Sequence, residues 1–185
     1  MSGPIELPLR MDQAGFPLCS GTALDGFREV FDACVREHGA PLYRLALRLT
    51  GAAADAEDLV QEALLRGWRG IASFRGEAAL GTWLFRIVLN LGRRRRKRFR
   101  PLPDELSGVV DPAEKLARRE LLDRVMAEVH RLPRRQSEAL LLRASAGLGH
   151  REIAGVMGIT AAAVKSHLAQ ARRRILARFP GEVLP

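Results

Sequence analysis

The chain has 185 residues, which is long enough for one domain of ordinary size or two small ones. Its 47% apolar residues exclude wholesale disorder, and with only 5% aromatic residues the core must consist mainly of Leu, Ala, Val and Ile. Lys and Arg total 30 against 21 Asp and Glu, which gives a formal net charge of +9. This excess indicates a polyanionic partner, either nucleic acid or an anionic membrane surface.

Several other classes of protein are excluded. The two cysteines, Cys19 and Cys34, are too few for a disulfide scaffold or an all-cysteine zinc site. No apolar run approaches the roughly 18 residues of a membrane-spanning helix. A basic region followed by an apolar stretch, which would mark a secretory signal, is also missing from the N-terminal sequence. We therefore expect a soluble cytoplasmic protein that needs no cofactor and does not insert into a membrane.

The positive charge is concentrated in the middle of the chain. Residues 1–92 carry 9 basic and 11 acidic side chains, residues 93–100 (RRRRKRFR) carry 7 basic and no acidic ones, and residues 101–185 carry 14 and 10. A charge run is ordinarily a solvated segment, most often at a chain end. Because this run is internal and continues an apolar helical pattern, phosphate binding is favoured. The near-neutral N-terminal part then requires a different partner.

The first half of the chain is predicted to be helical after a flexible extension at residues 1–23. Apolar residues at helical spacing predict four helices, at about 24–39, 41–51, 54–68 and from 82 into the arginine run. Gly39 is expected to end the first helix, Pro41 to lie in the first turn of the second, and Thr82 to cap the fourth. Residues 70–81 contain three glycines and are predicted to form a loop.

The second half begins with a change in composition at residues 101–112, where three prolines accompany Asp, Ser and Gly. This segment is predicted to be a flexible linker at a domain boundary. Further helices are predicted at about 113–130, 134–145, 150–157 and 161–178. No stretch shows sustained period-two alternation, so no sheet is expected. The predicted fold is all-α, with two small helical domains at residues 24–100 and 113–185, the second of them a helix-turn-helix domain.

Residues 147–175 follow the pattern of a helix-turn-helix. Gly158 permits the positive φ of a tight turn between two helices, and Thr160 can cap the second helix. The inward positions are Ile153, Ala154, Met157, Val164 and Leu168, and the outward positions are Lys165, Ser166, Ala169, Gln170 and Arg172. The outward polar groups suit phosphates and base edges in a DNA major groove. An ordinary helical hairpin is the alternative, but the basic outward face and the basic residues 172–174 favour DNA.

Residues 55–62 (DAEDLVQE) place acidic and amide side chains on one helix face, opposite a face of Leu and Val. The members of this acidic stripe are Asp55, Glu57, Asp58, Gln61 and Glu62. A solvated surface is the ordinary explanation of such a stripe. In a basic protein it also suits a positively charged protein partner, because DNA would be repelled there.

Residues 82–90 (TWLFRIVLN) carry Trp83, Phe85 and Asn90 ahead of the arginine run. Aromatic rings can stack on unpaired bases, and an Asn amide offers a base edge both a donor and an acceptor. Taken alone, Trp83 and Phe85 are more often core residues than base platforms.

The order of these segments resembles the extracytoplasmic-function (ECF) sigma factors, the short class of promoter-specificity subunits of bacterial RNA polymerase. The resemblance covers about residues 27–178. It rests on DAEDLVQE, the glycine loop, TWLFRIVLN with its arginine-rich continuation, the Pro-containing linker, LPRRQSEALLLR and the helix-turn-helix ending in VKSHLAQAR. It implies a protein without an active site of its own that binds core RNA polymerase and promoter DNA, and that an anti-sigma factor commonly holds.

The resemblance also implies roles for individual residues. The acidic stripe would dock on basic clamp helices of the largest polymerase subunit. The minus-ten promoter element would be opened and read by Phe74, Arg75, Trp83, Arg86 and Asn90, and nearby phosphates would be held by Arg93, Arg94, Arg95 and Arg96. The minus-thirty-five element would be read by Thr160, Lys165, Ser166, His167, Gln170, Arg172 and Arg173. Members of the family often carry Arg at the positions of His167 and Gln170, so fewer charged contacts with DNA are expected here.

Other functions compete with this interpretation. A stand-alone helix-turn-helix regulator would explain the C-terminal half, but it would leave the acidic stripe without a role and would bind its operator without polymerase. A module that imitates a sigma factor to sequester an anti-sigma factor would not need the basic residues 93–100. An enzyme is least favoured, because the four histidines are scattered and neither a Ser-His-Asp arrangement nor a phosphate-binding glycine loop after a strand is recognisable.

Overall fold

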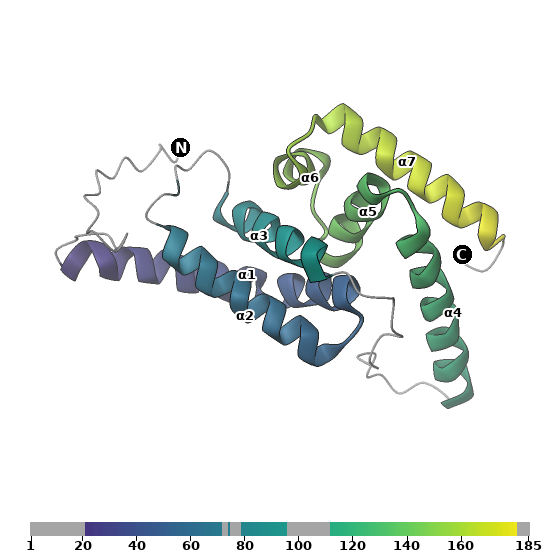
Figure 1. Ribbon diagram of the computed structural model, residues 1–185, viewed down its shortest axis with the longest axis horizontal. Helices are drawn as coiled ribbons and strands as arrows, with labels where there is room; N and C mark the ends of the chain where they lie inside the picture. The colour runs from purple at the N-terminus through teal and green to yellow at the C-terminus, as the bar shows by residue number, and fades with distance from the viewer. Residues whose placement is uncertain (1–20, 72–73, 75–78, 96–111, 181–185) are drawn as a thin grey trace.

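The computed structural model describes residues 21–71, 74, 79–95 and 112–180, and within these ranges it contains helices and no strand (Figure 1). The prediction of an all-α fold is thereby confirmed. None of the helices in these ranges is long and apolar enough to cross a membrane.

The N-terminal bundle consists of α1 (Gly21–Thr50), α2 (Ala53–Gly70) and α3 (Leu80–Arg95), and each of these helices packs on the other two. Fully buried apolar side chains from all three helices form its core: Leu42, Leu45, Leu59, Leu84, Phe85, Val88 and Leu89. Gly67 allows α2 to approach α3 closely, since a Cβ at this position would lie 2.6 Å from Leu84 Cδ2. Only glycine fits there without movement of the neighbouring side chain.

Helix α1 is a single helix where two were predicted. The expected end at Gly39 and restart at Pro41 are wrong, because the helix runs through both residues. Its buried side chains lie on one stripe at helical spacing on both sides of the expected break: Phe31, Cys34, Leu42, Leu45 and Leu49. Burial of this stripe against α2 and α3 offsets the backbone hydrogen bond that Pro41 cannot donate.

Helix α3 begins two residues before the predicted cap. Thr82 is not the N-cap but a buried residue inside the helix. The backbone is already helical ahead of it, since the Trp83 amide donates to the Ala79 carbonyl at 3.1 Å. Thr82 instead faces the C-terminal half of the chain, where a Cβ added to Gly155 would lie 3.3 Å from its methyl group.

The C-terminal bundle consists of α4 (Pro112–Arg131), α5 (Arg134–Ala146), α6 (His150–Met157) and α7 (Ala161–Arg178). These bounds agree with the predicted helices to within one residue at each end. The predicted turn between α6 and α7 is confirmed, because Gly158 has a φ of +65° and the Thr160 side chain accepts a hydrogen bond from the Ala163 amide at 3.2 Å. The last two helices therefore form the expected helix-turn-helix.

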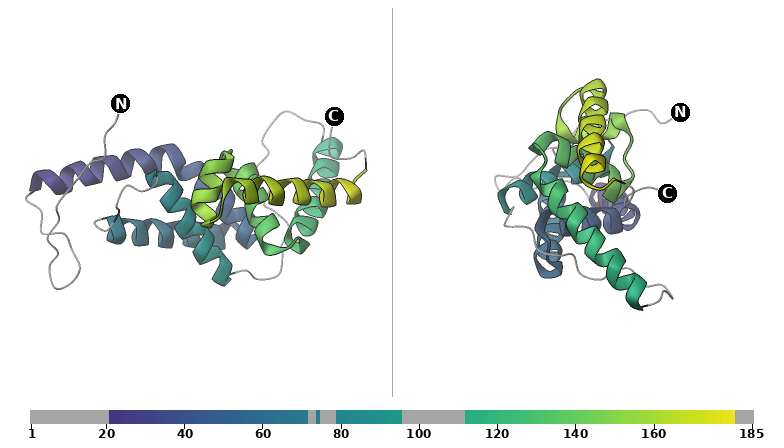
Figure 2. Two further views of the ribbon diagram at one scale, coloured as in Figure 1. Left: turned by 90° about the horizontal axis from the view of Figure 1, so that it is seen from above. Right: turned by 90° about the vertical axis from the view of Figure 1, so that its right-hand side faces the viewer.

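The two bundles pack against each other, α5 on α1 and α6 on α3 (Figures 1 and 2). We call this packing the closed arrangement. Of the predicted linker, residues 101–112, only Pro112 is described, and it is the first residue of α4. Of the predicted extension, residues 1–23, only residues 21–23 are described, and they belong to α1.

Cys34 offers a chemical test of the N-terminal core. Burial, with a smaller contribution from the charge of Glu37, raises the pKa of the Cys34 thiol to about 11. Since the thiolate is the reactive form, we expect iodoacetamide to modify Cys34 about 100-fold more slowly at neutral pH in the folded protein than in urea. A Cys19→Ser variant leaves a single thiol for this measurement. Equal rates in the two states would contradict the buried position.

Candidate DNA and polymerase interfaces

The acidic stripe lies on the side of α2 that faces away from the core, with Ala56, Leu59 and Ala63 buried on the opposite side. Glu57, Asp58 and Gln61 are exposed, and Asp55 and Glu62 are half-buried. Glu62 accepts a hydrogen bond from Arg66 one turn later, with 2.6 Å between Oε1 and Nη2. An ion pair this exposed contributes little free energy. Glu62 can therefore exchange Arg66 for a basic group of a protein partner at little cost.

Two apolar residues extend the stripe along the same helix face. Leu65 lies four residues after Gln61, and Trp68 lies seven after it. Their exposed fractions are 56% and 38%. The sequence pattern places Trp68 on the inner face, but its ring lies at the rim, where it meets Phe31 edge-on at 5.4 Å between centroids. An apolar extension beside carboxylates is typical of a protein-binding surface.

The aromatic residues near α3 divide between core and surface. Phe85 is 1% exposed and belongs to the core, which is the more frequent of the two roles considered for it from the sequence. Trp83 is half-buried and packs against Phe74, with 5.4 Å between ring centroids. The structure thus brings together Phe74 and Trp83, two of the residues expected to act on the minus-ten element. Arg75 lies outside the described residues.

The polar residues of α3 are linked to one another at its C-terminal end. Asn90 is exposed, and its Oδ1 accepts a hydrogen bond from Arg93 Nη1 at 2.8 Å. Arg94 is exposed as well. Arg95 ends the helix without a described side chain, and Arg96 lies outside the described residues.

Two arginines predicted to bind DNA are engaged by the C-terminal bundle. Arg93 donates to both carboxylate oxygens of Glu138 in α5, each at 2.8 Å. Arg86 donates to the Gly155 carbonyl of α6. Arg86, expected to act on the minus-ten element, and Arg93, expected to hold phosphate, are therefore both bonded to protein acceptors in the closed arrangement. In the closed arrangement these arginines can offer DNA only the N–H groups that the bonds to protein leave free.

Glu138 is the central acceptor between the bundles, and its side chain is 4% exposed. Arg134, one turn before it in α5, also donates to it, at 2.9 Å. Burial alone would raise the pKa of the Glu138 carboxyl, but the hydrogen bonds and charges of Arg93 and Arg134 outweigh burial and hold this pKa below its usual value. Glu138 is therefore ionised at neutral pH.

A second set of contacts joins α1 to the end of α5. Arg44 Nε donates to the Ser145 carbonyl at 3.0 Å, and Arg48 Nη1 donates to Ser145 Oγ at 3.1 Å. Sequence reasoning missed these residues and Glu138, because the partners lie between 45 and 101 positions apart.

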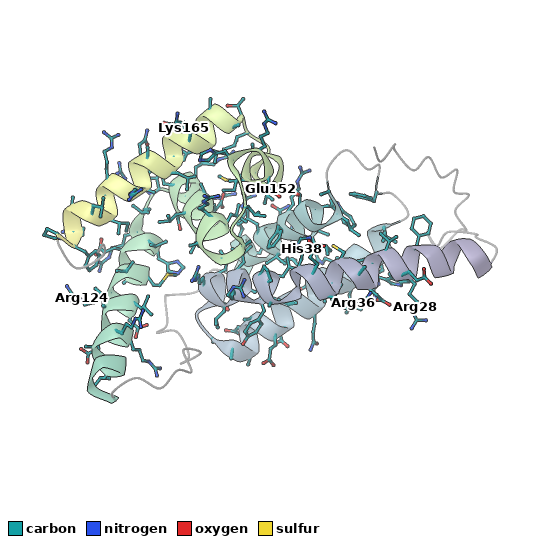
Figure 3. The ribbon with its side chains drawn as sticks, turned by 180° about the vertical axis from the view of Figure 1, so that it is seen from behind. Arg28, Arg36, His38, Arg124, Glu152 and Lys165 are labelled. Atoms are coloured by element: carbon teal, nitrogen blue, oxygen red, sulfur yellow. The ribbon has the colours of Figure 1, made fainter. Side chains whose placement is uncertain are left out.

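Most of the predicted recognition residues lie on the outer side of α7, where Lys165, Ser166, Arg172 and Arg173 are exposed. Lys165 also borders a shallow depression between the first turns of α6 and α7, together with Glu152 (Figure 3). Thr160 is confirmed as the cap of α7.

Two recognition residues turn partly inward. His167 is half-buried, and its Nδ1 has no hydrogen-bond partner within the described part of the chain. Gln170 was expected to lie outward, but it is half-buried because its side chain is bonded to Gln136 of α5, with 2.7 Å between Oε1 and Nε2.

A helix-turn-helix whose capped second helix carries exposed basic residues is typical of a DNA-binding protein, and the acidic outer face of α2 on the same chain suits a protein partner. Residues 34–100 match the family model of sigma-70 region 2, and residues 122–175 match that of sigma-70 region 4. The chain is 37% identical over 158 residues to the ECF RNA polymerase sigma factor SigM of Mycobacterium tuberculosis, covering 84% of this chain and 80% of the relative. The protein belongs to the family of ECF RNA polymerase sigma factors.

Other comparisons agree with this assignment. The chain is 30% identical over 166 residues to the RNA polymerase sigma-H factor of Pseudomonas aeruginosa, covering 81% of this chain and 86% of the relative. The solved structure of CnrH in complex with the cytosolic domain of CnrY is similar with a TM-score of 0.66 at 26% identity, covering 85% and 92% of the two chains. The sigma factor RpoE in complex with the anti-sigma factor NepR from Bartonella quintana shares the fold, with a TM-score of 0.57 at 23% identity over 85% and 96%.

Proposed function

We propose that this protein binds core RNA polymerase as its sigma subunit and directs it to promoters, where it assists strand opening. The observation that carries the proposal is the pairing of the acidic stripe on α2 with the capped recognition helix α7, each inside a region that matches a sigma-70 family model. The protein itself contributes binding and no bond chemistry, which belongs to the polymerase.

The two halves have separate tasks in this proposal. Residues 24–100 dock on polymerase through the acidic stripe and act on the minus-ten element through α3 and the loop before it. Residues 101–112 are the linker, and residues 113–185 bind the minus-thirty-five element as duplex DNA through α7. Support comes from the charge of each surface, since carboxylates suit basic protein and the exposed Lys and Arg of α7 suit phosphate.

We further propose that the protein acts in the cytoplasm and that an anti-sigma factor controls it. The solved structure of CnrH, which is 26% identical to this chain, contains the cytosolic domain of a second protein, CnrY. A partner that stabilised the closed arrangement would keep Arg86 and Arg93 bonded to the C-terminal bundle and so reduce the N–H groups that they can offer DNA.

The direct test is transcription in vitro with core polymerase on genomic fragments. The proposal expects defined RNA start sites that appear only when the protein is added to core enzyme. The proposal fails if the complex starts RNA only at sites that core polymerase also uses without the protein, or at none. Tight, specific binding of the isolated protein to a duplex operator would instead support a stand-alone helix-turn-helix regulator.

Asn90→Ala should impair promoter opening more than initial binding, because the exposed amide can contact a base edge only after the strands separate. Arg94→Gln is the matched comparison on the same helix. Its loss of one phosphate contact should weaken initial binding and lower the salt slope of log affinity by about 0.9. Permanganate footprinting measures opening, and filter binding measures the initial complex. Equal losses of both for Asn90→Ala would contradict the assigned role.

A further inference from the structure

A buried residue of α5, Gln136, orients the side-chain amide of Gln170 in α7. Gln136 in α5 is 5% exposed, and its Nε2 donates to Gln170 Oε1 at 2.7 Å. Gln170 Nε2 in turn donates to Ser166 Oγ, one turn earlier in α7, at 3.2 Å. The three side chains form a chain of hydrogen bonds that runs from the interior of the bundle to the outer side of α7.

This chain fixes which hydrogen-bonding groups face the groove. A glutamine amide ordinarily pairs with adenine by donating to N7 and accepting from N6. Here the bond from buried Gln136 turns the Gln170 carbonyl oxygen toward α5, and the amide nitrogen lies on the exposed side with Ser166, so the amide directs N–H groups outward. The Ser166 oxygen accepts from Gln170, and its hydroxyl keeps a proton that it can donate to a base. Both side chains therefore present donors.

We propose that Gln136 is a positioning residue for promoter specificity, which makes Gln170 and Ser166 select a base edge with adjacent acceptors, namely guanine. Guanine carries N7 and O6 side by side in the major groove, whereas adenine places a donor beside N7. The inference rests on the proposed function, in which α7 enters the groove of the minus-thirty-five element. It adds a determinant of base choice that lies outside the recognition helix.

The bonding of Gln136 also indicates how it can be changed without loss of the fold. Its own Oε1 is buried and has no hydrogen-bond partner among the described residues. Replacing Gln136 with leucine removes this unsatisfied acceptor, and Gln170 is exposed enough for water to replace the lost donor. Gln136→Leu should therefore fold with an unchanged helical content, and Gln136→Met provides a second apolar variant of similar length.

The test uses holoenzyme assembled from core polymerase and full-length protein, on a promoter library randomised in the minus-thirty-five element. Sequencing of the transcribed templates reports the base preference at each position. For the unchanged protein we expect one position at which guanine exceeds adenine by about tenfold. In Gln136→Leu and Gln136→Met this ratio should fall to about two, because the freed carbonyl lets Gln170 pair with adenine. Preferences at other positions should stay the same.

Gln170→Ala provides the control that separates positioning from general stability. Alone, it should abolish the preference at the same position, and adding Gln136→Leu to it should change nothing further. The inference is overturned if the position that depends on Gln170 prefers adenine or cytosine in the unchanged protein. It is equally overturned if both Gln136 variants keep the guanine preference at that position. It is also overturned if they weaken all positions equally. These outcomes differ from failure of the proposed function, in which the unchanged holoenzyme selects no template from the library.

Discussion

Reversing the charge of both Asp58 and Glu62 to lysine should weaken binding of core polymerase by about 100-fold and leave the fold intact. Both residues lie on the solvent side of α2, so the substitutions replace attraction to a basic partner with repulsion. Inside the protein the change removes the surface pair between Glu62 and Arg66, which is worth only about 0.5 kcal/mol. Surface plasmon resonance on immobilised core enzyme measures the affinity, and circular dichroism checks the fold.

A matched control keeps the same change in net charge at a distance from the stripe. Glu29 in α1 and Glu120 in α4 are both exposed, and their replacement by lysine should leave polymerase affinity within about twofold. If the control and the Asp58 and Glu62 variant lose affinity equally, the loss reflects total charge and the acidic stripe is not the docking surface.

Replacing Glu138 with glutamine should loosen the closed arrangement and raise the affinity of the free protein for promoter DNA by about tenfold. The amide keeps the shape of the carboxyl but removes the charge that holds Arg93 in two hydrogen bonds. Hydrogen bonds to a charged group contribute about 1.5–3 kcal/mol, and the partial exposure of Arg93 lowers this figure. Fluorescence anisotropy measures DNA binding, and energy transfer between labels on α2 and α7 measures separation of the bundles.

Glu128→Gln is the matched control for this variant. Glu128 also pairs with two arginines, Arg131 and Arg178, but all three residues belong to the C-terminal bundle. The Glu128→Gln substitution should leave unchanged both the distance between the labels on α2 and α7 and the affinity for promoter DNA. An unchanged distance in Glu138→Gln as well would show that the Arg93 bond does not hold the bundles together.

Acid should open the closed arrangement through the same carboxyl. The pKa of Glu138 in this arrangement lies below its ordinary value of 4.5. Its contribution to stability is therefore complete above about pH 4.5 and is lost as the pH falls through the lowered pKa. Energy transfer between α2 and α7 should fall in this acidic range, and the Glu138→Gln variant should lack that part of the transition.

The sequence by itself determined the helices of the C-terminal bundle, the turn at Gly158, the cap at Thr160 and the acidic face of α2. Each of these depends on residues within about one or two helical turns of each other, so spacing and residue type suffice to predict it. The order of the motifs was likewise enough to indicate the family, which the comparisons confirmed.

Only the tertiary structure decided which helix faces meet. Apolar residues mark a helix face as buried but do not name its partner, so the continuity of α1 through Pro41 and the exposure of Trp68 could not be predicted. Glu138, which binds Arg93, and Gln136, which binds Gln170, lie 45 and 34 residues away from them in the chain. A hydrogen bond over such a separation depends on how the helices pack, and packing is a property of the folded molecule as a whole.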